Sequence, residues 1–279
     1  MPSKNQWQAQ KSTHARNTLL MVIVMLLSGC NLQHSLLYFP SSTLPAEESL
    51  TAAHLKPWPS PSLSEYRALV STRETASQKG TIIIFHGNGG TAIDRTFYME
   101  TLAPLGYRVI LAEYPRYGGR KGELGEKAFV TDAMETTQLA FEQFGEPIFL
   151  LGESLGCGVA AATANHSPIP IEGIILITPW DTLRAITQAK FPFLPVRIFL
   201  TDSYDTIANL KSFPGRVAVV AAGQDTIIPI QHADHLYRSI TTSAKKMWQI
   251  QAAGHNDLLF HTNQAWWRVI MDFVTGADH

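Results

Sequence analysis

Six short runs of β-branched and other apolar residues alternate with stretches of helical periodicity, and this alternation constrains the fold more than any other feature. The runs occupy residues 81–85, 107–112, 147–151, 173–177, 217–221 and 247–250. Continuous apolar runs of this length are typical of strands buried on both faces of a parallel sheet. Helical spacing is found in residues 91–104, 126–144, 155–165, 231–241 and 262–275. The alternation predicts an α/β fold, a mostly parallel twisted sheet with helices on both faces.

Composition narrows the class of protein. The chain has 279 residues, of which 45% are hydrophobic and 16% charged, which favours one large folded domain over a disordered chain. The formal net charge of -1 gives no electrostatic reason to expect a nucleic acid as a partner. The two cysteines, Cys30 and Cys157, are too few for a disulfide-stapled scaffold or a cysteine-rich zinc module. We expect Cys157 to be a small buried residue.

The N-terminus has the pattern of a secretory signal peptide over residues 1–29. Lys4, Lys11 and Arg16 come first without any acidic residue, and an apolar run over 19–27 follows. A membrane-spanning helix needs roughly 20 apolar residues, about twice the length of this run. A tilted signal anchor or a buried core helix are the alternatives.

The end of the run, Leu27-Ser28-Gly29-Cys30, resembles the bacterial lipobox. The resemblance implies that Cys30 becomes the acylated first residue of a membrane lipoprotein, and Asn31 in place of Asp favours the outer membrane, facing the periplasm. The Ser, Thr and Pro residues that follow indicate an irregular lead-in. We therefore expect a tether over 30–60 and one folded domain over 61–279.

Two interpretations compete for the loop His86-Gly87-Asn88-Gly89-Gly90-Thr91-Ala92 after the first predicted strand. Its glycine spacing fits a dinucleotide-binding fingerprint, and Glu113 ends the next strand where a ribose-binding acid would lie. Alternatively, its backbone N–H groups form an oxyanion hole, which stabilises negative charge that develops on a substrate oxygen.

A nucleophile elbow follows the third strand. Gly152-Glu153-Ser154-Leu155-Gly156 has the G-x-S-x-G pattern, which places a serine on a sharp turn between a strand and a helix. The same position puts the Leu155 N–H where an oxyanion would form. A plain helix N-cap is the alternative for Ser154.

Partners for such a serine follow the last two strands. Asp225 comes 71 residues after Ser154, and His255 comes 30 residues after Asp225, in the order expected of this elbow. All three lie at carboxyl ends of strands, which is where binding and reacting groups usually lie in such sheets. The spacing predicts a nucleophile, an orienting acid and a base on one rim.

Other residues could take part. Asp181 could replace Asp225 as the acid. Asp257 and His261 are better explained as loop and helix-start residues than as partners of His255. His232 and His235 have the spacing of a metal pair, but a solvated helix face explains them better.

Together these motifs resemble the α/β-hydrolase fold, and more narrowly its Bem46-like branch. The resemblance implies that Asn88 and Leu155 donate the oxyanion-hole N–H groups, and that residues 180–214 form at most a small lid. It rests on the HGN loop at His86–Asn88, the elbow, Asp225, Gly254-His255, the turn Tyr114–Gly118 and the lead-in Ser35–Pro40.

We therefore expect a membrane-anchored serine hydrolase that cleaves carboxylic ester or thioester bonds through an acyl-enzyme. We expect a small acyl-ester or lipid-like substrate, a membrane contact through Cys30, no nucleic acid, no cofactor or metal, and a monomer. The alternatives are a non-catalytic lipoprotein scaffold on a hydrolase shell, a serine peptidase and a dinucleotide-binding oxidoreductase.

Overall fold

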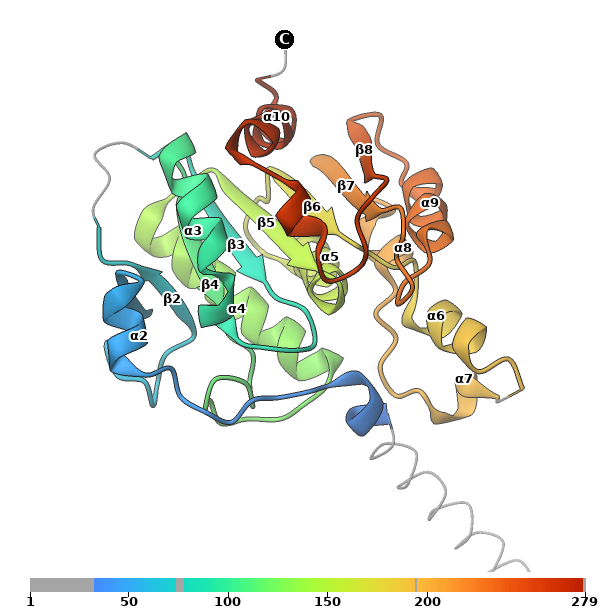
Figure 1. Cartoon of the computed structure of the whole chain (residues 1–279), viewed down its shortest axis with the longest axis horizontal. Coiled ribbons are helices and arrows are strands. Elements are labelled where there is room, and N and C mark those ends of the chain that lie inside the picture. Colours follow the sequence, from blue (N-terminus) through green and yellow to red (C-terminus); the bar gives the residue numbers. More distant parts are fainter. Residues whose placement is uncertain (1–32, 74–77, 194, 278–279) are drawn as a thin grey trace, which may run out of the picture.

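The computed structural model describes residues 33–73, 78–193 and 195–277 (Figure 1). The predicted signal peptide and Cys30 lie outside these residues. The strands are β1 (Leu55–Trp58), β2 (Ala68–Ser71), β3 (Thr81–Phe85), β4 (Arg108–Ala112), β5 (Ile148–Glu153), β6 (Gly173–Ile177), β7 (Arg216–Ala222) and β8 (Lys245–Ile250). The helices are α2 (Glu47–Ala52), α3 (Thr96–Leu102), α4 (Glu126–Phe144), α5 (Leu155–His166), α6 (Leu183–Lys190), α7 (Val196–Phe199), α8 (Thr206–Leu210), α9 (Ile230–Ser239) and α10 (Gln264–Thr275), with 3-10 turns η1 (Ala92–Arg95), η2 (Ala103–Leu105) and η3 (Leu258–His261).

These strands form one twisted sheet in the order β1-β2-β4-β3-β5-β6-β7-β8. The pairs from β4 to β8 are parallel, whereas β1 pairs with β2 and β2 with β4 in antiparallel fashion. Every strand predicted from the apolar runs is present, so the α/β prediction is confirmed. The β4–β3–β5 order places the loop after β3 beside the loop after β5.

Each central strand contributes to two separate cores. In β3, Ile83 packs into one hydrophobic cluster and Ile82 into the other, because successive side chains point to opposite faces of a sheet. The first cluster includes residues of α4, α5, α8 and α9, and the second includes residues of α3 and α10. Figure 1 shows α3 and α10 in front of the sheet and α4 behind it. The helices therefore cover both faces, as the alternation predicts.

The lead-in is more ordered than the sequence indicates. Residues 47–52 form α2, and residues 55–58 form β1 at the edge of the sheet. Leu50 and Trp58 are buried in the two cores, and the indole of Trp58 stacks on Phe144 with 6.0 Å between ring centroids. The prediction of an irregular tether reaching to residue 60 is therefore wrong for this stretch, because its apolar residues have a sheet edge to cover.

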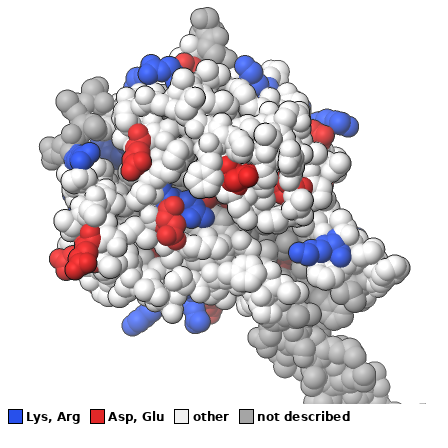
Figure 2. All heavy atoms as spheres, in the orientation of Figure 1, with Lys and Arg blue, Asp and Glu red and all other residues white. Residues whose placement is uncertain are grey.

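The described helices and the described surface have two further features. In residues 33–277, apart from the gaps given above, no helix combines the length and apolar character needed to cross a bilayer. On the face drawn in Figure 2, Lys and Arg side chains are scattered among Asp and Glu, so no large area of one sign forms there.

Candidate active site

Ser154 lies on a strained turn between β5 and α5. Its backbone has φ 51° and ψ -111°, in the left-handed region that costs a non-glycine residue energy. The turn is close-packed, since a Cβ on Gly152 would overlap the oxygen of Gly156 and one on Gly156 would overlap the oxygen of Phe85. The two glycines of the motif are therefore steric requirements, and the elbow prediction matches the observed geometry.

His255 and Asp225 reach this serine from the loops after β8 and β7. Nε2 of His255 lies 3.0 Å from Oγ of Ser154, and Nδ1 of His255 lies 2.7 Å from Oδ2 of Asp225. The other oxygen of Asp225 accepts the N–H groups of Ile227 and Ile228, at 2.9 and 2.7 Å. The structure thus brings the three predicted residues into one hydrogen-bonded chain.

Burial and loop contacts hold the hydrogen-bonded residues Ser154, His255 and Asp225 in place. The side chains of His255 and Asp225 are 9% and 2% exposed. Asp257 accepts the Gly254 N–H at 2.6 Å and so fixes the loop that carries His255, as expected of a loop residue. A hydrogen bond in such a site is stronger than one in water because little solvent competes for it.

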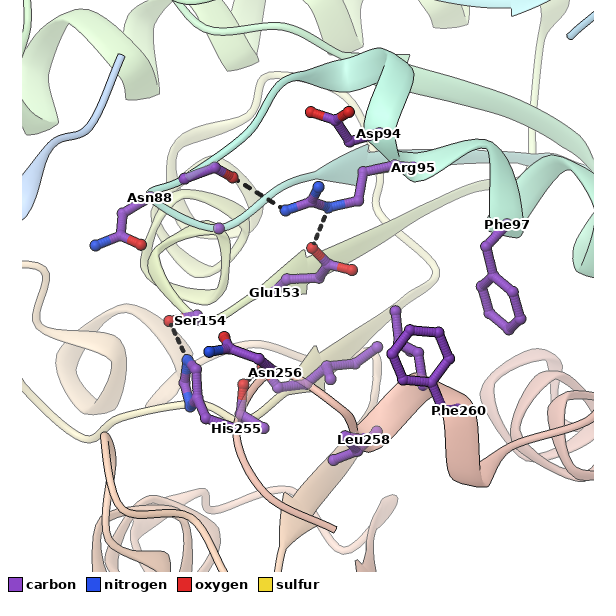
Figure 3. A pocket seen from close by; sticks show the side chains of 15 residues that line it. Asn88, Asp94, Arg95, Phe97, Glu153, Ser154, His255, Asn256, Leu258 and Phe260 are labelled. Carbon is purple, nitrogen blue, oxygen red and sulfur yellow. Dashed lines mark hydrogen bonds and ion pairs between the residues drawn. The ribbon is translucent and has the colours of Figure 1, made fainter. Parts of the chain in front are cut away.

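A pocket of about 420 Å³ opens beside Ser154. Figure 3 shows Ser154 and His255 at one end of it and the rings of Phe97 and Phe260 at the other. Ile177, Leu258 and Leu259 add further apolar lining, whereas Asn88 and Asn256 lie toward the serine. The pocket therefore has a polar reacting end and an apolar far end.

The glycine loop after β3 forms one wall of the pocket. Asn88 lines it next to Ser154, and its carbonyl accepts hydrogen bonds from the Tyr117 hydroxyl at 2.8 Å and the Phe39 N–H at 3.2 Å. Its side-chain Nδ2 donates to the carbonyl of Leu37 at 3.1 Å. Leu155 is buried at the first position of α5. Among the described residues, the backbone N–H groups of Asn88 and Leu155 have no hydrogen-bond acceptor.

Glu113, which the dinucleotide interpretation requires as a ribose ligand, is buried and already bonded. Its carboxylate meets Nε2 of His86 at 2.9 Å and accepts the backbone N–H groups of Ala92 and Tyr114, at 2.9 and 3.2 Å. These contacts fix the start of the glycine loop against β4. Glu113 therefore stabilises the conformation of the glycine loop, and its carboxylate has no free oxygen to accept a hydrogen bond from a ribose hydroxyl.

Asp181 lies on the loop between β6 and α6 and binds two other histidines. Nδ1 of His232 and Nδ1 of His235 each lie 2.9 Å from one of its oxygens. Asp181 therefore does not take the place of Asp225. The solvated helix face predicted for the histidine pair is wrong for His232, which is mostly buried against Asp181. In the described parts of the chain, neither these three side chains nor any other group of His, Cys, Asp and Glu is arranged so that it could hold a metal ion.

Arg95 and Glu153 form an ion pair in the pocket wall that sequence reasoning missed. Nε of Arg95 donates to Glu153 at 2.6 Å, and the Tyr98 hydroxyl donates to the other Glu153 oxygen at 2.6 Å. Burial acts to lower the pKa of Arg95, but the charge of Glu153, the hydrogen bond to it, and the nearby Tyr98 and Asp94 together raise that pKa above its ordinary value. The available signal was Glu153 itself, a charged residue inside the elbow motif whose buried position demands a partner.

Residues 180–214 form α6, α7 and α8. None of their described residues lines the pocket beside Ser154. Leu210 of α8 is buried in the core cluster that also contains α5 and α9. The described residues of this stretch therefore form helices beside the sheet and no lid over the pocket at Ser154.

Comparison with known proteins gives the wider context. The family described as "Serine aminopeptidase, S33" matches residues 76–201. The uncharacterized protein Rv2307c of Mycobacterium tuberculosis is 30% identical over 179 residues, which is 63% of this chain and 63% of that protein. Lysophosphatidylserine lipase ABHD12 of Danio rerio is 27% identical over 58% of this chain, and protein bem46 of Schizosaccharomyces pombe is 25% identical over 77% of it.

Solved structures decide the fold. The Pyrococcus furiosus esterase Pf2001 superimposes with a TM-score of 0.64 at 14% identity, over 86% of this chain and 97% of the esterase. The monoacylglycerol lipase of Paleococcus ferrophilus gives a TM-score of 0.54 at 18% identity, over 72% of this chain and 95% of the lipase. The chain has the α/β-hydrolase fold.

The matches with curated relatives are partial. The matched stretch covers 63% of the mycobacterial protein, 47% of the zebrafish lipase and 73% of bem46. The similarity to Bem46-like and ABHD12-like proteins agrees with the resemblance drawn from the HGN loop and the elbow.

Proposed function

We propose that this protein is a serine hydrolase that cleaves carboxylic ester or thioester bonds through an acyl-enzyme. The observation that carries the proposal is the hydrogen-bonded chain from Ser154 through His255 to Asp225. A serine hydroxyl is a weak nucleophile until a base takes its proton, and a base acts best when a third group fixes its tautomer. These three residues have that arrangement.

In the proposed mechanism His255 takes the proton of Ser154 as the serine oxygen attacks the substrate carbonyl carbon. Asp225 holds the Nδ1–H tautomer of His255 and stabilises the imidazolium that forms. Collapse of the tetrahedral intermediate expels the alcohol or thiol, which receives the proton from His255. Water then attacks the acyl-enzyme with His255 again as base, and the carboxylic acid leaves.

The backbone N–H groups of Asn88 and Leu155 would bind the oxyanion of the tetrahedral intermediate. Both are free of protein acceptors among the described residues, and they come from the two loops that flank Ser154. A donor of this kind is worth about 3 kcal/mol of transition-state stabilisation. Because the donors are backbone groups fixed before substrate arrives, they need no reorganisation.

The pocket favours esters of a single apolar acyl chain. Its far end is lined by Phe97, Leu258, Leu259 and Phe260, and Phe260 is 88% exposed, so this end is open. A long chain could therefore leave the pocket past Phe260. A lysophosphatidylserine lipase and a monoacylglycerol lipase are among the similar proteins, and both are named for lipids with one acyl chain.

An activity-based probe tests the nucleophile. We expect a fluorophosphonate to label the wild-type chain and to leave Ser154→Ala unlabelled, and we expect only the wild type to hydrolyse p-nitrophenyl butyrate. A panel of p-nitrophenyl esters and acyl thioesters of increasing chain length would then define the substrate. Equal labelling of Ser154→Ala and wild type would contradict the assignment of Ser154 as the nucleophile and favour the non-catalytic scaffold.

We also propose that the protein is a lipoprotein, acylated on Cys30 after removal of residues 1–29, and held at the periplasmic face of the outer membrane. The lipobox-like sequence before Cys30 supports this. Cys30→Ala should fail to incorporate radiolabelled palmitate and should appear in the soluble fraction or remain unprocessed. Fractionation and migration identical to the wild type would contradict the proposal.

A serine peptidase is the second candidate, because the matching family is described as a serine aminopeptidase. An aminopeptidase needs a carboxylate to bind the free amine of its substrate. Both oxygens of Glu153 in the pocket wall are engaged, by Arg95 and Tyr98, and Oδ2 of Asp94 accepts the N–H of Thr91. We therefore expect aminoacyl p-nitroanilides to be hydrolysed far more slowly than p-nitrophenyl esters.

A further inference from the structure

The segment that enters the fold first, residues 33–40, is held firmly against it. Oε1 of Gln33 accepts the N–H of Thr201 at 2.6 Å, and the Gln33 amide donates to Asp202. The hydroxyl of Tyr38 donates to Asp202 and lies 3.0 Å from the hydroxyl of Tyr204. Gln33 and Tyr38 are buried. The chain is therefore fixed in position from Gln33 onward.

Only Asn31 and Leu32 separate this fixed segment from Cys30. Three Cα–Cα steps of 3.8 Å span at most about 11 Å. A lipid on Cys30 would enter the bilayer at its polar surface, so Gln33 could lie no more than this distance from that surface. The side of the protein that carries residues 33–40 must then face the membrane.

That side exposes two large apolar side chains. Leu36 is 57% exposed and Phe39 is 55% exposed, although Gln33 and Tyr38 beside them are buried. Residues 33–37 are helical, and the Tyr38 N–H continues the helix with a hydrogen bond to His34. Leu36 is the fourth residue of this helix and Phe39 lies two residues beyond its end, so both exposed apolar side chains belong to one short stretch of chain. Paired exposed apolar residues of this kind suit insertion into a bilayer interface.

The same segment touches the rim of the pocket. The Leu37 carbonyl accepts from the side chain of Asn88, and the Phe39 N–H donates to the carbonyl of Asn88. Asn88 in turn lines the pocket next to Ser154. Any surface that contacts Leu36 and Phe39 therefore lies next to the wall of the Ser154 pocket.

We propose that Leu36 and Phe39 form a docking surface for the lipid bilayer in which Cys30 is anchored, and that docking presents the rim of the Ser154 pocket to that bilayer. The substrate would then reach the site from the membrane rather than from the aqueous phase. This inference rests on the proposed lipidation of Cys30 and the proposed hydrolase activity. Its tests distinguish a failure of docking from a failure of lipidation or of hydrolase activity.

The first test measures membrane contact without activity. Leu36→Cys is labelled with the fluorophore NBD in the lipidated full-length protein, where Cys157 is buried and Cys30 carries lipid. Val269→Cys is the matched control, because Val269 is 50% exposed on α10, which Figure 1 shows at the end of the molecule opposite the segment 33–37. The vesicles contain phosphatidylcholine, phosphatidylglycerol and a nitroxide-labelled lipid.

We expect the label at position 36 to shift to shorter wavelength and to be quenched several-fold more than the label at position 269. Equal quenching at both positions would overturn the proposal. So would a shift at position 36 that needs no vesicles and grows with protein concentration, because a second copy of the chain would then cover the surface.

The second test measures the consequence for turnover. Leu36→Asp/Phe39→Asp should lower hydrolysis of monoacylglycerol in vesicles by about tenfold, since it removes the interfacial contact, and should leave hydrolysis of soluble p-nitrophenyl butyrate unchanged. A flexible Gly/Ser insertion between Asn31 and Leu32 should act in the same direction. Val269→Asp should change neither rate.

The outcomes are distinguishable. The docking proposal is overturned if a folded Leu36→Asp/Phe39→Asp chain loses hydrolysis of both vesicle monoacylglycerol and soluble p-nitrophenyl butyrate. It is also overturned if this variant hydrolyses vesicle monoacylglycerol at the wild-type rate. If the wild type hydrolyses no soluble ester, the hydrolase proposal fails while the quenching test still decides docking. If Cys30 carries no palmitate, the anchoring proposal fails, and the docking inference fails with it.

Discussion

Arg95 and Glu153 are joined by a hydrogen bond of 2.6 Å between Nε and Oε2, and the same guanidinium donates to the carbonyl of Gly89 at 3.2 Å (Figure 3). Arg95 thereby connects the glycine loop with the last residue of β5, directly before Ser154. The proposed oxyanion donors belong to these same two loops. Arg95 is thus placed to hold them at a fixed separation without meeting the substrate carbonyl itself.

Arg95→Ala should lower kcat for p-nitrophenyl butyrate by about tenfold or more, with little change in KM, because a small misplacement of fixed donors weakens only the transition state. Arg95→Lys keeps the charge but loses the two-pronged geometry, so we expect an intermediate loss. Thermal unfolding of each variant provides the control for folding. A folded Arg95→Ala chain with the wild-type kcat would contradict this positioning role.

Asp225 and Asp181 are both buried carboxylates that bind histidine, and they should differ sharply in their effect on activity. Asp225→Asn should lower kcat by about 10³- to 10⁴-fold, because an amide favours the wrong tautomer of His255. Asp181→Asn should leave kcat within a few-fold of the wild type, because its partners, His232 and His235, lie on α9 and outside the pocket lining. Steady-state kinetics on one ester decides between the two acids.

Asp181 should also give stability a dependence on acid pH. Burial raises its pKa, but hydrogen bonds from His235, the Thr182 N–H and His232 outweigh burial and hold the pKa below the ordinary value of 3.8. The native state therefore binds this proton more weakly than the unfolded chain. The resulting stability is present above pH 3.8 and is lost as the pH falls through the lowered pKa.

Chemical denaturation of wild type and Asp181→Asn measures this effect. We expect the wild type to be more stable by about 1 to 3 kcal/mol at pH 7, because the substitution replaces an acceptor of several hydrogen bonds. The difference should persist at pH 5 and shrink below pH 3.8. Glu100→Gln, an exposed change on α3, is the control. A difference between wild type and Asp181→Asn that grows as the pH falls would be inconsistent with the lowered pKa.

Cys157 should be chemically inert in the native protein. Burial raises the pKa of its thiol, and Sγ donates to the carbonyls of Gly152 and Ile177, at 3.1 and 3.2 Å. Thiol reagents attack the thiolate, so the native chain offers neither the reactive form nor access. In a Cys30→Ala chain, where Cys157 is the sole cysteine, DTNB at pH 8 should react only after guanidinium is added. Rapid reaction of the native chain would show that the elbow opens.

The sequence predicted the central sheet well because five of its six parallel strands are almost completely buried apolar runs; the sixth, β8, lies at an edge and is only partly buried. It missed β1 and β2, which are four residues long and antiparallel. In β1, Lys56 is exposed and Pro57 interrupts the run, a pattern that an edge strand tolerates but that periodicity does not detect. Residues 91–104, predicted as one helix, are divided into η1, α3 and η2.

The site was predictable to the extent that its chemistry depends on short motifs. Ser154, Asp225 and His255 could be proposed from spacing and strand ends, and the structure brings them together. Arg95 could not be found in this way, because its role depends on how η1 packs against the end of β5. The apolar lining by Phe97 and Phe260 could not be found for the same reason, since these residues are 163 positions apart and come together only in the tertiary structure.

The order β5-β6-β7-β8 also determines when activity can arise as the chain folds. Ser154 follows β5, Asp225 follows β7, and His255 follows β8, which is one of the two edge strands and the last strand to leave the ribosome. An intermediate that lacks the β7–β8 pairing would have a folded elbow and no base. The proposed hydrolysis would therefore report on the completed pairing of four strands, and a nascent chain that lacks β8 would be inactive.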